Sequence, residues 1–377
     1  MRSAIVHYWL LGMRGGEKVV EALCRLLPDA DIFTLFYDPE SISETIRSHR
    51  IFTSFLNPYR RHYRSLLPLM PIALEHFDLR AYDLIVSSES GPAKGVITSS
   101  HTRHVCYCHS PMRYLWDLYP AYLHEWTRWT PKRIIMAAAS NYLRVWDYAS
   151  AARVDEFIAN SKNVQNRIRR TYRRQSRVIY PPVDVDTFYC CAPDDYYLIV
   201  SELVAYKRIA DAVRCFSETG RRLRIVGDGP EYSNLKRAAG PTIEFCGRVT
   251  DRDLRYLYAR CRAVLVPGEE DFGIVAVEAV ASGKPLIGLA RGGLLEGVPS
   301  AYPPAAFLYS LPCEDELRQA VERFERQKAE ISPAIIQASA SRFSEKRFQR
   351  EMADVLFKKG PLFENDESAA LEAVSMR

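Results

Sequence analysis

Short apolar segments alternate with longer amphipathic segments along almost the whole chain. The apolar segments have the length of buried strands, and the amphipathic ones have the period of helices that bury one face. This alternation is typical of parallel β-sheets covered by helices. Two series of strands are predicted: Ala4–Tyr8, Asp31–Phe36, Leu84–Ser88, His104–Cys108, Phe157–Ala159 and Val178–Tyr180, then Tyr197–Val200, Leu223–Val226, Ile243–Phe245, Val264–Val266 and Pro285–Gly288.

A proline-rich segment, Tyr180–Phe188, separates the two series. Its paired prolines exclude a helix and favour an extended connector, so we expect a hinge between two domains here. The predicted division is an N-terminal domain of residues 1–187, a C-terminal domain of residues 188–343, and a terminal helix with a polar tail in residues 344–377. Because ligands of open parallel sheets bind outside the carboxyl ends of the strands, the site is expected in the interdomain cleft.

The net charge of +5 is unevenly distributed. Residues 1–187 contain 25 Lys and Arg against 18 Asp and Glu, whereas residues 188–377 contain 26 against 28. This excess fits either an acidic partner of the N-terminal half, such as a membrane surface, or an ordinary solvated surface. Nine irregularly spaced cysteines, no signal-peptide core and no apolar run long enough to span a bilayer predict a cytoplasmic protein, with at most peripheral contact at the inner face of the membrane. No nucleic-acid-binding module is predicted.

Two glutamates, Glu270 and Glu278, flank a predicted helix start. The free amides of such a start attract an anion, and Gly273 has no side chain to obstruct a diphosphate. Glu270 could accept hydrogen bonds from sugar hydroxyls, and Glu278, two turns further, from a ribose diol. An ordinary βα unit with two surface carboxylates is the alternative. The turn predicted to bind the diphosphate-containing ligand comprises Asp271, Phe272, Gly273, Ile274 and Val275, and it is called the donor-binding turn below.

This segment, continued by Ala279–Pro285, resembles the E-x7-E motif of retaining glycosyltransferases of family GT4. Nearly the whole chain is similar to that family, since Asp155–Ser161, Tyr180–Phe188, Val226–Glu231 and Phe245–Val249 match its segments in order and spacing. The resemblance implies an α/β protein of GT-B arrangement, with two Rossmann-like domains facing a cleft and a C-terminal helix crossing back. It also implies that backbone groups near Arg248 and Val249 hold the nucleobase.

Cations for the donor diphosphate are expected at the second domain's first loop. Lys207 falls where the family places a lysine on the diphosphate, and Arg208, often glycine in the family, could add a bidentate contact. Many relatives have arginine where this chain has Glu202, whose carboxylate would repel a diphosphate. We therefore predict that Glu202 points away or pairs with Arg208. A solvated helix start is the alternative for both basic residues.

The N-terminal domain contributes two further candidates. Gly15 and Gly16, in the segment Gly12–Lys18, resemble the family's glycine loop, where backbone approaches ligand closely. His109 follows a predicted strand, and the resemblance implies contact with the donor sugar, although a structural role is the alternative. Cys106 and Cys108 alternate along that strand and cannot clamp one ion. No metal site is predicted, and the D-x-D strings at residues 29–31 and 184–186 are interpreted as structural.

The string Cys108–Asp117, with Tyr8–Lys18 and Glu269–Ile274, most resembles bacterial mannosyltransferases that build polysaccharide and O-antigen repeats on lipid carriers. The resemblance implies GDP-mannose as donor, no cofactor, and an oligosaccharide or lipid-linked acceptor. It makes His109, Lys207 and Glu270 the candidate catalytic residues. A UDP-sugar donor, a non-catalytic sugar-nucleotide-binding protein and a nucleotide-sugar epimerase are the alternatives.

The acceptor is expected on the N-terminal domain. Tyr59–Arg64 precedes the apolar run Leu66–Ile72, and Trp126–Arg133 combines aromatic with basic residues. Basic and apolar groups side by side suit an anionic membrane interface. A loop packed on the core with solvated arginines is the alternative.

Overall fold

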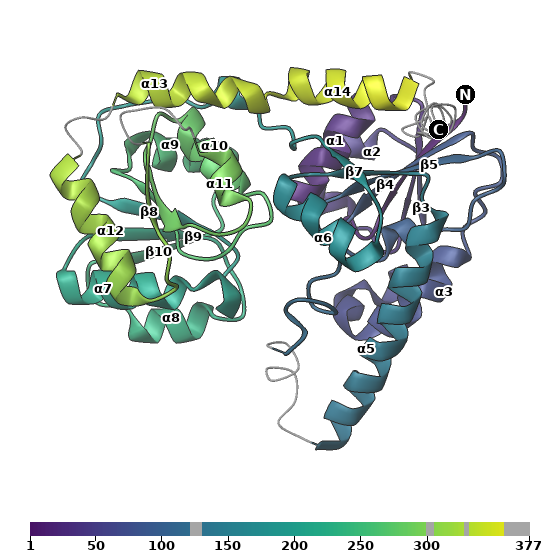
Figure 1. Cartoon of the computed structure of the whole chain (residues 1–377), viewed down its shortest axis with the longest axis horizontal. Helices are drawn as coiled ribbons and strands as arrows, with labels where there is room; N and C mark the ends of the chain where they lie inside the picture. The colour runs from purple at the N-terminus through teal and green to yellow at the C-terminus, as the bar shows by residue number, and fades with distance from the viewer. Residues whose placement is uncertain (121–129, 299–304, 328–331, 358–377) are drawn as a thin grey trace, which may run out of the picture.

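The computed structural model describes residues 1–120, 130–298, 305–327 and 332–357. These residues form two parallel sheets, a seven-stranded one in the order β3-β2-β1-β4-β5-β6-β7 and a six-stranded one in the order β10-β9-β8-β11-β12-β13. Each sheet is covered by helices and forms its own domain, and the last helices run along one side of both domains (Figure 1). The predicted pair of parallel-sheet domains is confirmed.

All the predicted strands are present, with ends shifted by at most two residues. The first sheet contains β1 (Ser3–His7), β2 (Asp31–Thr34), β3 (Ile51–Thr53), β4 (Leu84–Glu89), β5 (Arg103–Cys108), β6 (Glu156–Ala159) and β7 (Ser176–Val178). The second contains β8 (Tyr197–Val200), β9 (Leu223–Val226), β10 (Ile243–Gly247), β11 (Val264–Val266), β12 (Leu286–Leu289) and β13 (Ala306–Tyr309). Strands β3 and β13 were not predicted. Both are edge strands that are only partly buried, so their apolar pattern is weak.

Helices cover both faces of the N-terminal sheet. Ile5, Val86 and Tyr107 point from the sheet into one core, and Ala4 and Ile85 point into the other. The first core is closed by α1 (Gly15–Leu26), α2 (Glu44–Arg47) and α14 (Glu345–Phe357). The opposite face packs against η2 (Asn57–Leu69), α3 (Met70–Glu75), α5 (Thr130–Ser150) and α6 (Lys162–Tyr172). Short 3₁₀ segments are η1 (Pro39–Ser41), η3 (Ala93–Gly95) and η4 (Ala151–Arg153).

The C-terminal sheet is covered in the same way. One face packs against α7 (Ile209–Thr219), α8 (Tyr232–Ala238) and α12 (Glu314–Gln327). The other packs against α9 (Asp251–Arg260), α10 (Ile274–Ala281), α11 (Leu294–Gly297) and α13 (Pro333–Ala338). Short 3₁₀ segments are η5 (Val185–Thr187), η6 (Ala205–Lys207) and η8 (Ser339–Phe343). Because every strand pairing is parallel, the carboxyl ends of the strands in each sheet share one edge.

Two chain crossings join the domains. The first crossing is the linker around Val183, and the second is the segment around Phe343. They lie side by side, because the amide of Val183 donates to the carbonyl of Phe343 at 2.9 Å. Helix α14 then returns to the first domain, where Phe348 and Met352 are buried in its core and the Phe348 ring lies 5.6 Å from the Tyr107 ring. The predicted return of the C-terminal helix is confirmed. In the described part of the chain, no helix has the length and apolar character needed to cross a membrane.

Candidate active site

The start of α1 faces the C-terminal domain across the cleft. A methyl group on Gly15 would lie 2.7 Å from Cδ1 of Ile274, at the start of α10. Lys18 Nζ lies 3.9 Å from the Glu278 carboxylate, and the Arg14 guanidinium lies 3.8 Å from Glu202. The predicted glycine loop and the predicted donor helix therefore form opposite walls of one cleft.

Two of the three predicted catalytic residues, Glu270 and Lys207, lie close together beside the start of α10. Gly273 has φ +89°, a left-handed conformation that side chains disfavour, and it directs the chain into α10. Just before it, Oε2 of Glu270 lies 2.5 Å from Nζ of Lys207, and both side chains are mostly buried. Glu270 thus neutralises Lys207, and a diphosphate at this position would compete for the same ammonium group.

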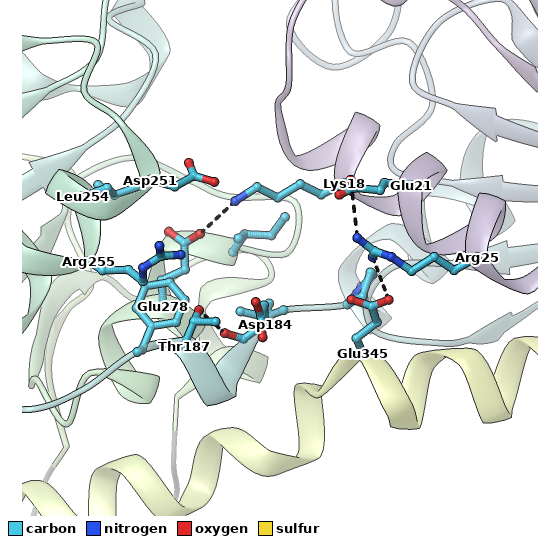
Figure 2. A pocket seen from close by; sticks show the side chains of 14 residues that line it. Lys18, Glu21, Arg25, Asp184, Thr187, Asp251, Leu254, Arg255, Glu278 and Glu345 are labelled. Atoms are coloured by element: carbon cyan, nitrogen blue, oxygen red, sulfur yellow. Dashed lines mark hydrogen bonds and ion pairs between the residues drawn. The ribbon is translucent and has the colours of Figure 1, made fainter. Parts of the chain in front are cut away.

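Glu278 lies in the second turn of α10 and is buried. The hydroxyl of Tyr258 on α9 donates to one carboxylate oxygen at 2.8 Å, and the other oxygen faces Lys18. Burial raises the pKa of Glu278. Its side chain lines an interdomain cavity of about 730 Å³, open mouth included, beside Asp251 and Arg255, and the linker also lines it (Figure 2).

His109 lies in the N-terminal wall, directly after β5. Its Nε2 is 2.8 Å from the Ser88 hydroxyl, and a methyl group on Gly16 would lie 3.8 Å from the same nitrogen. Burial, and then the neighbouring His7, lower the pKa of His109 to about 3. The imidazole is therefore neutral at physiological pH and suits a hydrogen bond to a hydroxyl better than a charge contact with phosphate.

Three predictions about individual side chains need correction. The Arg208 guanidinium pairs with Asp211 at 2.6 Å and donates to the Pro312 carbonyl, so both of these partners belong to its own domain. The Phe272 side chain is buried in the hinge and lies 5.5 Å from Tyr180 in a stacked arrangement. Only its backbone is left for the predicted donor-binding turn.

Glu202 does not pair with Arg208, as we predicted it could. Its partner is Arg14 from the glycine segment of the other domain, and both side chains are substantially exposed. The negative charge beside the diphosphate position is thus balanced across the cleft. This partner was not predictable from spacing along the chain, because it depends on how the domains meet.

The predicted base-binding loop follows β10 at the carboxyl edge of the sheet. Val249 packs partly into the core, whereas the Arg248 side chain is 74% exposed and lies 4.0 Å from Asp228 on the neighbouring loop. Within the described ranges, no group of three His, Cys, Asp or Glu side chains could hold a metal ion. The predicted segment Trp126–Arg133 lies outside the residues whose side chains are described.

Several residues at the cleft were not predicted. Lys18 belongs to the glycine segment, and Ser161, whose hydroxyl donates to the Asp271 carbonyl at 2.7 Å, ends a segment that matched the family. Both therefore had a signal in the sequence. Tyr258 and Arg167 had none, because Arg167 lies in a basic run that would equally suit a solvent-exposed helix. Arg167 in fact contacts the other domain at Glu269 and Asp271.

Comparison with known families matches each domain separately. Residues 13–187 match the model described as Glycosyltransferase Family 4, and residues 192–342 match the model described as Glycosyl transferases group 1. Both domains thus belong to glycosyltransferase families. The cleft described above lies between these two glycosyltransferase domains, and the predicted GT-B fold is confirmed.

Individual relatives of these glycosyltransferase domains are distant. An uncharacterized glycosyltransferase of Methanocaldococcus jannaschii is 28% identical over 39% of this chain and 44% of its own length. N-acetyl-alpha-D-glucosaminyl L-malate synthase of Bacillus anthracis is 31% identical over 26% of this chain and 28% of its own length. The chain thus matches less than half the length of these curated relatives. The crystal structure of Anabaena HepE in complex with UDP-glucose is similar in fold, with a TM-score of 0.69, 19% identity, and coverage of 94% of this chain and 99% of that chain.

Proposed function

We propose that the protein is a retaining glycosyltransferase that moves an α-mannosyl group from GDP-mannose to a glycan or lipid-linked saccharide. One observation carries the proposal: the Lys207–Glu270 pair lies just before α10, buried Glu278 lies in the second turn of that helix, and the start of the helix faces Gly15 across the cleft. The arrangement offers separate groups for a sugar, a diphosphate and a ribose, in that order.

In the proposed reaction, the bond between the sugar anomeric carbon and the diphosphate oxygen breaks, and the acceptor oxygen bonds to the same carbon from the same face. The acceptor proton passes to the departing diphosphate, so no protein base is required. Lys207, the amides at the start of α10 and the Gly15–Gly16 backbone would stabilise the charge on the leaving group. Glu270 and His109 would hold the sugar hydroxyls. Neither a metal nor a cofactor takes part in this scheme.

A UDP-sugar donor is a second candidate, and the fold similarity to a protein solved with UDP-glucose favours it. A thermal-shift panel of GDP-, UDP- and ADP-sugars separates the two. Stabilisation by GDP-mannose is the expected result, and stabilisation by UDP-sugars alone would refute the mannosyl assignment.

Turnover then tests the reaction class. Incubation with the stabilising donor and a lipid-linked saccharide should yield a glycosylated acceptor and free nucleotide. Donor binding without turnover would instead support a non-catalytic binding protein. Conversion of the donor sugar without any acceptor would support an epimerase.

The N-terminal surface supports an acceptor at a membrane. Every exposed residue of α5 from Ile134 to Ala149 is uncharged, and Ile135 and Val145 are 67% and 64% exposed. Helix α5 projects away from the domain (Figure 1). Tyr59 and Ile72, in the predicted acceptor segment, are also more than half exposed.

We therefore propose that this domain contacts an anionic lipid surface. Co-sedimentation with anionic vesicles should fall when Ile135 and Val145 are replaced by serine, and should persist in the control Tyr256→Ser, which alters an exposed aromatic residue on α9. Equal retention of both variants on the vesicles would contradict the proposal.

A further inference from the structure

The loop that contains Glu270 has three consecutive carboxylates, Glu269, Glu270 and Asp271. Lys207 of the same domain neutralises the middle one. The two flanking carboxylates are neutralised by arginines of the other domain. Without those arginines, the loop would present uncompensated negative charge beside the position proposed for a diphosphate.

Arg167 on α6 and Arg113 after β5 make these contacts. Arg167 places Nη2 2.6 Å from Glu269 and pairs through Nη1 with Asp271. Arg113 lies 3.2 Å from Asp271, and its guanidinium lies 5.4 Å from the ring centre of Tyr206, the residue before Lys207. Asp117 contacts both arginines, at 3.4 Å and 3.3 Å.

The N-terminus of α6 is held against the C-terminal domain independently of these side chains. The carboxylate of Glu296 accepts hydrogen bonds from the amides of Lys162 at 2.7 Å and Asn163 at 3.0 Å, as expected for an anion at a helix N-terminus. The Ser161 hydroxyl donates to the carbonyl of Asp271 at 2.7 Å. Arg167, two turns further along α6, is thereby aligned with the loop.

We propose that Arg113 and Arg167 are positioning residues for the proposed transfer reaction. They contact the residues on both sides of Glu270 and the residue before Lys207, so they set the geometry of that pair without touching it. Because they belong to the other domain, their contacts with the loop exist only when the domains are together, and they add to the hydrogen bond from the Gly293 amide to the Glu270 carbonyl within the loop's own domain. Domain closure and assembly of the Lys207–Glu270 pair are thus coupled. This inference rests on the proposed function for its kinetic consequence, but its structural part stands alone.

The test compares Arg167→Ala, Arg167→Lys and the control Arg169→Ala, which removes an exposed charge from the same helix. Arg167→Ala should lower kcat about tenfold or more and change the donor KM by about threefold or less, since the nucleotide groups on α10 are untouched. Arg167→Lys should recover part of kcat, because one ammonium replaces only one of two contacts. Deuterium exchange of the 268–274 amides should accelerate in Arg167→Ala and remain as in the wild type in Arg169→Ala.

A double-mutant cycle of Arg167→Ala with Glu269→Ala should be strongly non-additive. Unchanged loop exchange, or accelerated exchange with unchanged kcat, would overturn the positioning role. Equal loss in Arg167→Ala and Arg169→Ala would also overturn it. If the wild type transfers no sugar from any donor while loop exchange responds to Arg167→Ala, the proposed function fails and the interdomain contact stands.

Discussion

Replacing Glu278 by alanine should weaken nucleotide binding. Its side chain is 7% exposed, one oxygen accepts the Tyr258 hydroxyl at 2.8 Å, and the other lies 3.9 Å from Lys18. That second oxygen is the one available to a ribose diol. A hydrogen bond to a charged group contributes about 1.5–3 kcal/mol. At 1.4 kcal/mol per factor of ten, Glu278→Ala should raise the nucleotide Kd about 10- to 100-fold.

Isothermal titration of the free nucleotide measures this directly, and Glu278→Gln is the matched control. Glutamine keeps an acceptor for Tyr258 but removes the charge, so its affinity should lie between those of the wild type and alanine variants. Because burial raises the pKa of Glu278, wild-type affinity should begin to fall with decreasing pH earlier than for a solvent-exposed glutamate, and Glu278→Gln should remove that dependence.

Glu270→Ala provides the comparison that can refute the argument. Glu270 pairs with Lys207 at the sugar end of the helix start, so its loss should mainly slow transfer. If both alanine variants lose nucleotide affinity equally, the assignment of Glu278 to the ribose and Glu270 to the sugar is wrong.

Three further outcomes are expected. Lys94 is fully buried between Glu89 and Asp147, and Lys94→Met would leave these buried carboxylates without their cation, so the unfolding free energy in urea titrations should fall by about 3–5 kcal/mol. A loss below about 1 kcal/mol would contradict this, because losses that small are typical of substitutions at the surface. The pKa of His109 is about 3 in the folded protein, below the value of about 6.5 for an unfolded chain, so its contribution to stability is present at neutral pH and is lost as the pH falls below about 6.5. NMR should therefore show no titration of the His109 ring between about pH 5 and 8. A titration midpoint near 6.5 would refute the burial of this ring. Gly273→Ala should cost about 1–2 kcal/mol because of its positive φ, and an unchanged melting temperature would be inconsistent with the left-handed turn.

The arrangement of the residues around the start of α10 was largely predictable because it is local. One βα unit contains Glu270, Gly273 and Glu278. Within such a unit, the end of the strand and the period of the helix determine which side chains lie near the first turns of the helix. Lys207 and the Gly15–Gly16 loop were predicted from their resemblance to segments of the family, and each follows a buried strand at the edge where parallel strands present their carboxyl ends. The same periods predicted the strands of both sheets except the weakly patterned edge strands β3 and β13.

The sequence by itself therefore determined the two α/β domains, the linker between them and the local chemistry of each loop, since these depend on neighbours within a few residues. Only the tertiary structure decided which charges meet across the cleft. It placed Arg14 at Glu202 and Arg167 at Glu269, turned Arg208 toward Asp211, and buried Phe272 in the hinge. These partners are far apart in the chain. A sequence pattern does not show which acidic and basic side chains will pair, because the energy of a pair depends on a distance that only the packed structure sets.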